Sequence, residues 1–202
     1  MSGAVSRRSL AQLAAVVLAA GSSSRLHRPK QLLTLRGETL VHRAARLGLE
    51  AGANPVLVVV GAHGDAVARA VADLDVQLVH NPSWRRGMGT SLAVAVAALP
   101  ADVVAAMCLL TDQIGVTTAH LSALIQRHRR QRADATFSRY DEPGTRGPPV
   151  ILDRKLFLQV VGLRGDRGAR AVVRPQHRVS EVWLAGGDLD IDRPQDIPRH
   201  LQ

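Results

Sequence analysis

The stretch LAAGSSSRLHRPKQLL, residues 18–33, follows an apolar run of the length of a buried strand. Gly21 relaxes the backbone where this run ends, and residues 22–24 offer serine N–H and O–H donors in which phosphate oxygens could settle. Arg25 and Lys30 add positive charge that can neutralise charge developing during phosphoryl chemistry. The stretch therefore predicts a strand, a phosphate-binding turn and a basic clamp.

Two common nucleotide-binding motifs are absent from this loop. It lacks the G-x-x-x-x-G-K-[ST] pattern of a P-loop, and it lacks the G-x-G-x-x-G pattern of a dinucleotide-binding turn. Considered alone, the stretch is also compatible with an ordinary βα turn that has a serine N-cap and two solvated cations. The residues farther along the chain must distinguish these alternatives.

The composition favours a parallel sheet covered by helices. Hydrophobic residues make up 46% of the 202 residues and aromatic residues only 2%, so the core must consist of Ala, Val, Leu and Ile. We expect strands over residues 13–20, 55–60, 76–79, 103–110, 134–140, 150–152 and 179–184. We expect helices over 38–51, from about 65 to 73, over 120–132 and 153–161, and opening near 87–91 and 165–170, with a loop over 141–149.

The charge does not indicate a nucleic-acid-binding protein. The formal charge is +9 and the pI is near 11.3, but the arginines are scattered and the few aromatic residues provide no stacking platform for bases. The single cysteine, Cys108, lies in an apolar run and is expected to be a buried small hydrophobe rather than a nucleophile. No run approaches the roughly 20 apolar residues of a transmembrane helix. We expect neither nucleic acid nor membrane as a partner.

The amino-terminal residues imitate an export signal. Ser6, Arg7, Arg8 and an apolar stretch have the order of a twin-arginine signal. Cleavage after Ala20 would remove the first strand, which feeds directly into the loop at Gly21. We therefore expect residues 1–10 to be a basic tail, residues 11–202 to be one domain, and the protein to be cytoplasmic.

Asp112 is the first candidate for a metal ligand. It follows the most uniformly apolar strand, at the edge where ligands bind in open α/β sheets, and the sequence places no obvious lysine next to it. Mg²⁺ takes one or two carboxylates and completes its coordination with water and phosphate oxygens. A helix N-cap is the alternative role. Asp188, Asp190 and Asp192 could supply a second carboxylate, or they could form a solvated turn.

The segment 81–91 combines glycines with hydroxyl side chains before a predicted helix. The small profile of Gly87 and Gly89 beside Met88 and Ser91 would let a nucleobase lie against the backbone at the helix N-terminus. A plain capping turn is the alternative, and Trp84 is expected to anchor the loop. The eight histidines show no metal-ligand spacing.

These motifs together resemble one family. LAAGSSSRL with PKQLL, N-P-x-W-x-x-G-M-x-x-S-L, T-D-Q, R-G-P-P-V, G-D-R-G-A-R and D-I-D-R-P-Q-D occur in this order between about residues 16 and 196. The pattern resembles the MobA-like nucleotidyltransferases, and among them the MocA-type molybdenum cofactor cytidylyltransferases. The resemblance implies an α/β protein with a Rossmann-like three-layer fold and a mostly parallel mixed sheet.

The resemblance also implies roles for individual residues. It places the nucleotide against Leu18, Ala19, Ala20, Gly21, Ser22, Ser23, Ser24, Arg25, Lys30, Asn81, Gly87, Met88 and Ser91. Arg25, Lys30 and Asp112 would be catalytic, and Asp112 with Asp192 would hold Mg²⁺. Pro148, Asp166 and Arg170 would lie on the acceptor side.

The implied reaction is the transfer of CMP from CTP to the terminal phosphate of molybdopterin, with release of pyrophosphate. An ionised phosphate is already a nucleophile, so the site needs positioning and charge stabilisation rather than a general base. Two positions depart from the family pattern: Ile114 stands where a proline usually follows D-Q, and Pro148 stands where a histidine commonly follows R-G. Another phosphorylated acceptor, GTP as donor, or a non-catalytic nucleotide-binding chaperone for molybdenum hydroxylases are the alternatives. The combination of two cations with two carboxylates favours an enzyme.

Overall fold

The computed structural model describes residues 12–187. The expected basic tail and the candidate ligands Asp188, Asp190 and Asp192 lie outside the described residues. Arg25 is described through its backbone in the 3₁₀ turn η1 (Ser24–Leu26), and its side chain lies outside the described part.

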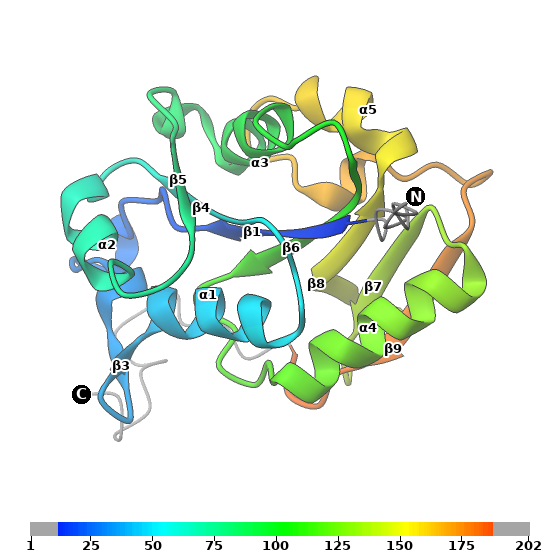
Figure 1. Ribbon diagram of the computed structural model, residues 1–202, viewed down its shortest axis with the longest axis horizontal. Coiled ribbons are helices and arrows are strands. Elements are labelled where there is room, and N and C mark those ends of the chain that lie inside the picture. Colours follow the sequence, from blue (N-terminus) through cyan, green and yellow to red (C-terminus); the bar gives the residue numbers. More distant parts are fainter. Residues whose placement is uncertain (1–11, 188–202) are drawn as a thin grey trace, which may run out of the picture.

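The described residues form a central sheet of seven strands in the order β5-β4-β1-β6-β8-β7-β9 (Figure 1). The strands are β1 (Gln12–Leu18), β4 (Val56–Val60), β5 (Gln77–His80), β6 (Val103–Leu110), β7 (Ala135–Arg139), β8 (Arg146–Asp153) and β9 (Val179–Trp183). β8 runs antiparallel to its neighbours β6 and β7, whereas all other neighbouring pairs are parallel. The predicted α/β class with a mostly parallel mixed sheet is confirmed.

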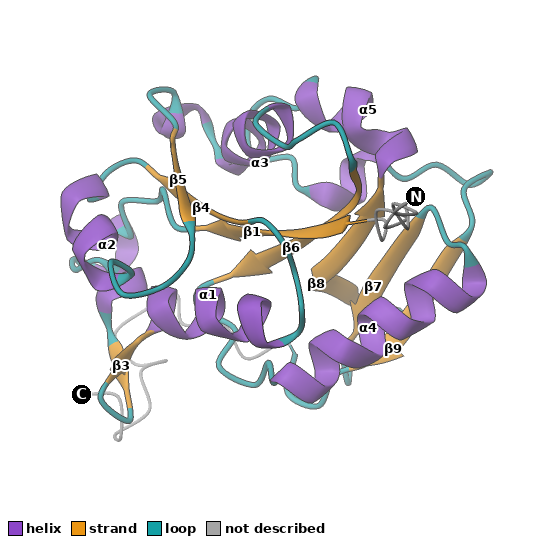
Figure 2. Cartoon of the chain, in the orientation of Figure 1, coloured by secondary structure: helices purple, strands orange, loops and turns teal. Residues whose placement is uncertain are grey.

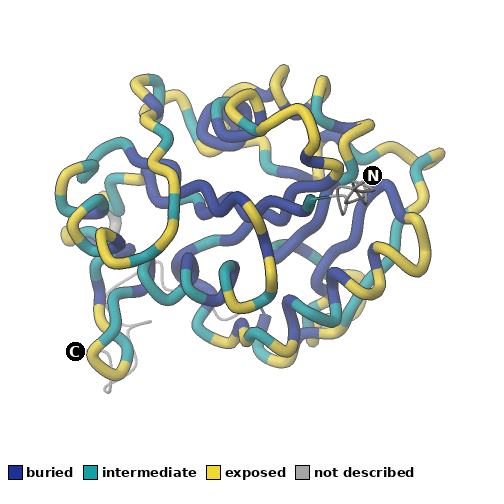
Figure 3. The backbone as a smooth tube through the Cα atoms, viewed as in Figure 1, coloured by how far each residue is buried: buried dark blue, intermediate teal, exposed yellow. Residues whose placement is uncertain are grey.

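Helices cover both faces of the sheet (Figures 1 and 2). The helices are α1 (Leu40–Glu50), α2 (Gly64–Ala70), α3 (Met88–Ala97), α4 (Thr118–Gln131) and α5 (Phe157–Val161). α1, α2 and α4 pack on the face that carries Leu13 and Val17, and α3 and α5 pack on the face that carries Val16. The inner strands are buried along nearly their whole length (Figure 3). Because both of their faces are covered, they are apolar at nearly every position. The architecture is therefore the predicted three-layer one.

Several element boundaries differ from the prediction. The helix expected from residue 38 begins at Leu40, where Thr39 is the N-cap and accepts a hydrogen bond from His42 N. The two residues before it pair with β2 (Thr34–Leu35) as β3 (Glu38–Thr39), a short hairpin that the sequence analysis missed. The helix expected over 153–161 divides into the 3₁₀ turn η4 (Arg154–Leu156) and α5. The helix expected near 165–170 is only the 3₁₀ turn η5 (Ala169–Val172).

β8 begins inside the segment that was expected to be a loop, and it tolerates two prolines for a structural reason. The register between β7 and β8 jumps from Phe137–Val150 to Ser138–Gly147, so Pro148 and Pro149 fall between paired residues. The pairing of β8 with β6 starts only at Val150. The missing proline N–H groups therefore leave no gap in either ladder.

Candidate active site

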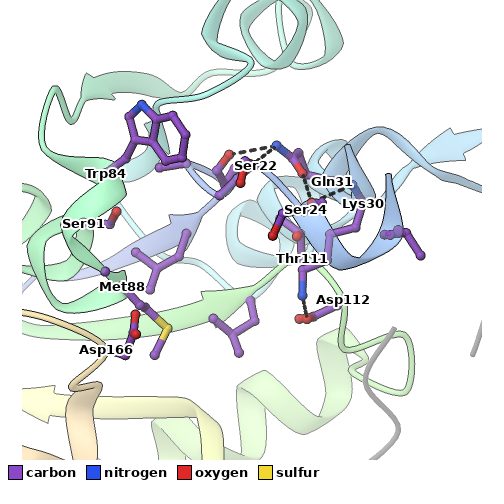
Figure 4. A pocket seen from close by; sticks show the side chains of 18 of the residues that line it. Ser22, Ser24, Lys30, Gln31, Trp84, Met88, Ser91, Thr111, Asp112 and Asp166 are labelled. Carbon is purple, nitrogen blue, oxygen red and sulfur yellow. Dashed lines mark hydrogen bonds and ion pairs between the residues drawn. The ribbon is translucent and has the colours of Figure 1, made fainter. Parts of the chain in front are cut away.

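A cavity of about 420 Å³ lies at the carboxyl ends of the parallel strands β1, β5 and β6. We call it the carboxyl-edge cavity. Its walls are Leu18, Ala19, Ala20, Gly21, Ser22, Ser23, Ser24, Leu26, Lys30, Gln31, Trp84, Arg85, Gly87, Met88, Ser91, Leu110, Thr111, Asp112 and Asp166 (Figure 4). Four segments that are far apart in the sequence thus meet at the edge where α/β sheets bind ligands.

Gln31 fixes the shape of the loop that follows β1. Its side chain is only 2% exposed, and its Nε2 donates to the carbonyl oxygens of Ala19 (3.3 Å) and Gly21 (3.0 Å). Its Oε1 accepts a hydrogen bond from Ser23 Oγ at 3.2 Å. The sequence analysis predicts no role for Gln31. The signal for one was the position of this amide side chain between Lys30 and the apolar residues Leu32 and Leu33. Its buried hydrogen bonds hold the backbone of the loop in place.

The three serines of the loop differ in what they contact. Ser23 has a left-handed backbone (φ 54°), and its Oγ also accepts from Lys30 N at 3.0 Å. Its hydroxyl is therefore used to close the loop. The hydroxyls of Ser22 and Ser24 line the cavity and make no hydrogen bond to any other described residue. They remain available as donors toward a ligand.

Lys30 and Asp112 form an ion pair across the cavity (Figure 4). The sequence places no obvious lysine next to Asp112, but the fold brings Lys30 Nζ onto Asp112 Oδ2 from 82 residues away. Asp112 is 5% exposed, and its Oδ1 has no hydrogen-bond partner among the described residues. A buried carboxylate oxygen without a partner is costly unless something else binds it.

The donor chemistry at Asp112 fits a hard divalent cation. Mg²⁺ prefers carboxylate oxygens and keeps waters or phosphate oxygens in its remaining positions, so one or two protein ligands suffice. Within residues 12–187 there is no cluster of three or more His, Cys, Asp or Glu side chains that could hold a metal ion. An all-protein metal cage is therefore not the arrangement in the described part of the chain.

Asn81 lies behind the cavity wall rather than on it. It is 2% exposed, and its Nδ2 donates to Thr90 Oγ1 and Ser91 Oγ, both at 2.9 Å. Its Oδ1 accepts from Ser83 N at 2.9 Å. Asn81 thus orients the start of α3 and the wall residue Ser91, while its own side chain does not line the cavity.

The start of α3 is pressed against the segment 164–167. Gly87 has φ +102°, and a Cβ on it would lie 2.3 Å from the carbonyl carbon of Gly165. Gly89 N donates to Gly165 O at 2.9 Å. Only glycine fits such an approach of two backbones. This contact brings Asp166 to the cavity opposite the loop, beside Met88 (Figure 4).

Trp84 packs partly against the core, as expected of an anchor, but it also lines the cavity. The guanidinium of Arg85 lies 4.6 Å from the centre of its ring, a cation–π contact. Arg85 is a cation on the cavity wall that the sequence analysis did not single out.

A second, smaller cavity of about 160 Å³ shares Leu18, Met88 and Leu110 with the first one. We call it the apolar cavity. The rest of its wall is Leu92, Cys108, Phe137, Pro148, Val150, Gly168, Ala169 and Arg170. The structure thus brings Pro148 and Arg170 together here, whereas Asp166, the third residue predicted on the acceptor side, lies on the carboxyl-edge cavity.

Cys108 is 3% exposed, and burial raises the pKa of its thiol to about 12. The thiol is thus held in its neutral form near pH 7, and the thiolate is the nucleophilic form of cysteine. The prediction of a buried small hydrophobe is confirmed.

The two departures from the family pattern have clear positions. Ile114 packs against the small cluster of Leu26, Leu33 and Leu40 under the loop. The carbonyl of Pro148 accepts from Gln113 Nε2 (2.9 Å) and from Tyr140 Oη (2.6 Å). Gln113, which follows Asp112, is thus hydrogen-bonded to Pro148 in the wall of the apolar cavity.

Comparison with known proteins assigns the chain to a family. Residues 15–181 match the MobA-like NTP transferase domain. The chain is 38% identical over 176 residues to nicotine blue oxidoreductase of Paenarthrobacter nicotinovorans, which covers 84% of this chain and 82% of that protein. It is 24% identical to the molybdenum cofactor cytidylyltransferase of Escherichia coli, over 90% of this chain and 92% of that protein.

A solved structure shares the same fold. Rv0371c from Mycobacterium tuberculosis H37Rv superposes with a TM-score of 0.81 at 30% identity, over 94% of this chain and 97% of that one. The same protein has also been solved in complex with manganese. Among residues 12–187, no helix is both long and apolar enough to cross a bilayer. This chain belongs to the MobA-like NTP transferase family of nucleotidyltransferases.

Proposed function

We propose that this protein is a Mg²⁺-dependent cytidylyltransferase that transfers CMP from CTP to the terminal phosphate of molybdopterin. One observation carries the proposal: a single cavity is lined by the glycine-serine loop, Lys30 and a buried carboxylate, Asp112, with an unpartnered oxygen. The E. coli relative with a molybdenum cofactor cytidylyltransferase activity in its name supports the choice of donor and acceptor.

The residues of the cavity suit an in-line displacement at the α-phosphorus. An oxygen of the acceptor phosphate forms the new bond to phosphorus, and the bond to the bridging oxygen breaks as pyrophosphate leaves. Gly21, Ser22 and Ser24 would orient the triphosphate, and Lys30 would neutralise charge on its oxygens. No histidine is among the described wall residues, which agrees with a reaction that needs no general base.

Asp112, together with Asp192 beyond the described residues, would hold the Mg²⁺. When bound, the ion supplies charge neutralisation at the phosphates. Lys30 then has a second role, because it would pass from the carboxylate to the phosphate oxygens as the carboxylate binds the ion. Arg25, on the same loop, would contribute a further cation.

We place the body of the acceptor in the apolar cavity. It borders the carboxyl-edge cavity through three shared residues, so an acceptor there would present its phosphate toward the nucleotide. Its wall is largely apolar, which suits the face of a flat ring system, and Arg170 suits an anionic substituent. Pro148 and Asp166 would lie on either side of this acceptor.

The same apolar cavity also favours a second candidate function. An aromatic substrate beside a nucleotide-binding cavity is the arrangement that a reductase needs, and the 38% identical relative has nicotine blue oxidoreductase as its name. In that case a reduced nicotinamide dinucleotide would deliver a hydride to the aromatic substrate, and a proton from solvent would complete the reduction.

One assay separates these functions. Purified protein with Mg²⁺, [α-³²P]CTP and molybdopterin should release pyrophosphate and a labelled cytosine dinucleotide, while GTP, ATP and UTP give little product. A parallel reaction with NADH or NADPH and an aromatic dye should show no oxidation of the nicotinamide. Turnover with GTP alone would replace the donor in our proposal. Nicotinamide oxidation without nucleotidyl transfer would establish the second candidate instead.

A further inference from the structure

A second charged cavity lies at the opposite edge of the sheet, at the amino ends of β1 and β6. Its volume is about 290 Å³, and we call it the basic hollow. Leu13, Val104, Ala105 and Ala133 form its apolar floor. Leu13 lies near the start of β1, and Val104 and Ala105 lie near the start of β6. Because both strands end at the carboxyl-edge cavity, the two cavities are separated by the length of the sheet.

The rim of the basic hollow is strongly cationic. Arg129, Arg132 and Arg178 line it, and none of them forms an ion pair with a described residue. Lys155 also lines it and pairs with Asp134 at 2.9 Å. Asp153 is the one carboxylate among the described wall residues, so positive charge prevails on the rim.

Helix α4 ends at this rim, but the arginine side chains there do not cap the carbonyl groups at its end. The N–H of Arg132 donates to the carbonyl oxygens of Arg129 and His128, and the N–H of Ala133 also donates to His128 O. Backbone groups therefore satisfy these terminal carbonyls. The guanidinium groups of Arg129 and Arg132 are not needed there as hydrogen-bond donors.

A buried histidine gives the hollow a polar wall. His128 is 6% exposed, and its Nδ1 lies 3.0 Å from Thr136 Oγ1, which in turn lies 2.8 Å from Ser180 Oγ. Its Nε2 has no hydrogen-bond partner among the described residues. If the two hydroxyls donate in sequence toward Nδ1, the neutral ring carries its proton on Nε2.

We propose that the basic hollow binds a small organic phosphate, at a site separate from the carboxyl-edge cavity. The guanidinium groups of Arg129, Arg132 and Arg178 would bind the phosphate oxygens, since their planar forks match oxyanions. His128 Nε2 would donate one more hydrogen bond. The apolar floor, which includes the 39% exposed Val104, would contact the organic part of the ligand. The site does not depend on the function proposed above.

Two ligands test whether the hollow binds an organic phosphate or free phosphate. Phenyl phosphate carries an apolar body, whereas inorganic phosphate carries none. Each is titrated into the full-length protein while the imidazole ¹H–¹⁵N signal of His128, assigned with His128→Gln, is followed by NMR. We expect saturable shifts with both, and tighter binding of phenyl phosphate because of the floor. Equal affinities for the two ligands would show that the hollow binds free phosphate only, and would overturn the proposal that the apolar floor contacts an organic group.

Matched variants test the rim. Arg129→Gln with Arg178→Gln should weaken phenyl phosphate binding about tenfold or more. Arg130→Gln changes a cation at the same helix end that does not line the hollow, and it should leave binding unchanged. Arg178→Gln alone serves if the double variant does not fold. The proposal fails if the His128 signal does not move, or if Arg130→Gln weakens binding as much as the rim variants, which would indicate diffuse attraction to a basic surface.

Discussion

The carboxyl-edge cavity and the apolar cavity share Leu18, Met88 and Leu110, yet they are built in opposite ways. The first takes its shape largely from loop backbone: Gln31 donates to the carbonyls of Ala19 and Gly21, and Asn81 accepts a hydrogen bond from Ser83 N. The second is shaped by side chains from β6, β7, β8 and α3. Polar recognition here therefore rests on fixed backbone, whereas the apolar wall can change with single side-chain substitutions.

This contrast suggests a division of labour under the proposed function. Backbone donors suit a triphosphate, which is common to all nucleotide donors. Side-chain shape suits the acceptor, in which related enzymes can differ. Substitutions at the carboxyl-edge cavity should therefore affect every substrate, and those at the apolar cavity should affect the acceptor alone.

The largest effect is expected from Asp112→Asn. The amide keeps the shape of the side chain but removes the charge that pairs with Lys30 and would hold Mg²⁺. Turnover should fall by about a hundredfold to a thousandfold, measured as pyrophosphate release at saturating CTP and Mg²⁺. Asp65→Asn, at the start of α2 and outside both cavities, should retain full activity. Turnover within twofold of wild type in Asp112→Asn would remove this carboxylate from the mechanism.

Gly87→Ala should be the most damaging change to the shared framework. The added Cβ would meet the backbone of Gly165, and the positive φ adds strain, so we expect a loss of about 2 to 4 kcal/mol in the free energy of unfolding. Urea denaturation measures it. Gly37→Ala has a similar φ of +83° with nothing within 4 Å of the new Cβ, and should lose only about 1 kcal/mol. Equal losses in both variants would show that the contact with the segment 164–167 does not matter.

Gln31→Ala tests whether buried hydrogen bonds hold the loop. It removes the donors to Ala19 and Gly21, and should destabilise the protein by about 1 to 3 kcal/mol. The KM for CTP should rise because the loop loses its fixed shape. Gln126→Ala, on the exposed side of α4, is the control and should change neither quantity. An unchanged KM in Gln31→Ala would mean that the loop is fixed by other contacts.

The smallest effect is expected from Arg170→Gln in the apolar cavity. Loss of one charge-assisted contact should raise the KM for the acceptor about fivefold and leave the KM for CTP unchanged. Steady-state kinetics with each substrate varied in turn gives both values. Arg167→Gln, three residues earlier and on neither cavity wall, is the matched control. A rise in the KM for CTP instead would contradict the separation of the two cavities.

The features of the site that depend on short stretches of sequence could be predicted from the sequence alone. The strand predicted over 103–110 is β6, and Asp112 follows it at the cavity as expected. The loop after β1 and the segment with Gly87 and Met88 also line that cavity. Local periodicity and turn chemistry determine these features, so they could be predicted without tertiary contacts.

The remaining features depend on contacts between distant residues. The pairing of Lys30 with Asp112 and the role of Gln31 arise only when the loop folds back over β1 and β6. The apolar cavity draws on Leu18, Phe137 and Val150, whose apolar character predicted only a buried core. The prolines of β8 indicated a loop, because the register shift that accommodates them is a property of the assembled sheet.

The ion pair between Lys30 and Asp112 has a consequence for the stability of the free protein. The Asp112 carboxylate is already paired with a cation of the same chain, the ammonium group of Lys30. This ammonium group takes the place of a divalent cation before substrate arrives. Folding therefore does not require an ion from solution to neutralise this buried charge. Treatment with a chelator should leave the melting temperature essentially unchanged, so that a metal bound here serves the reaction and not the fold.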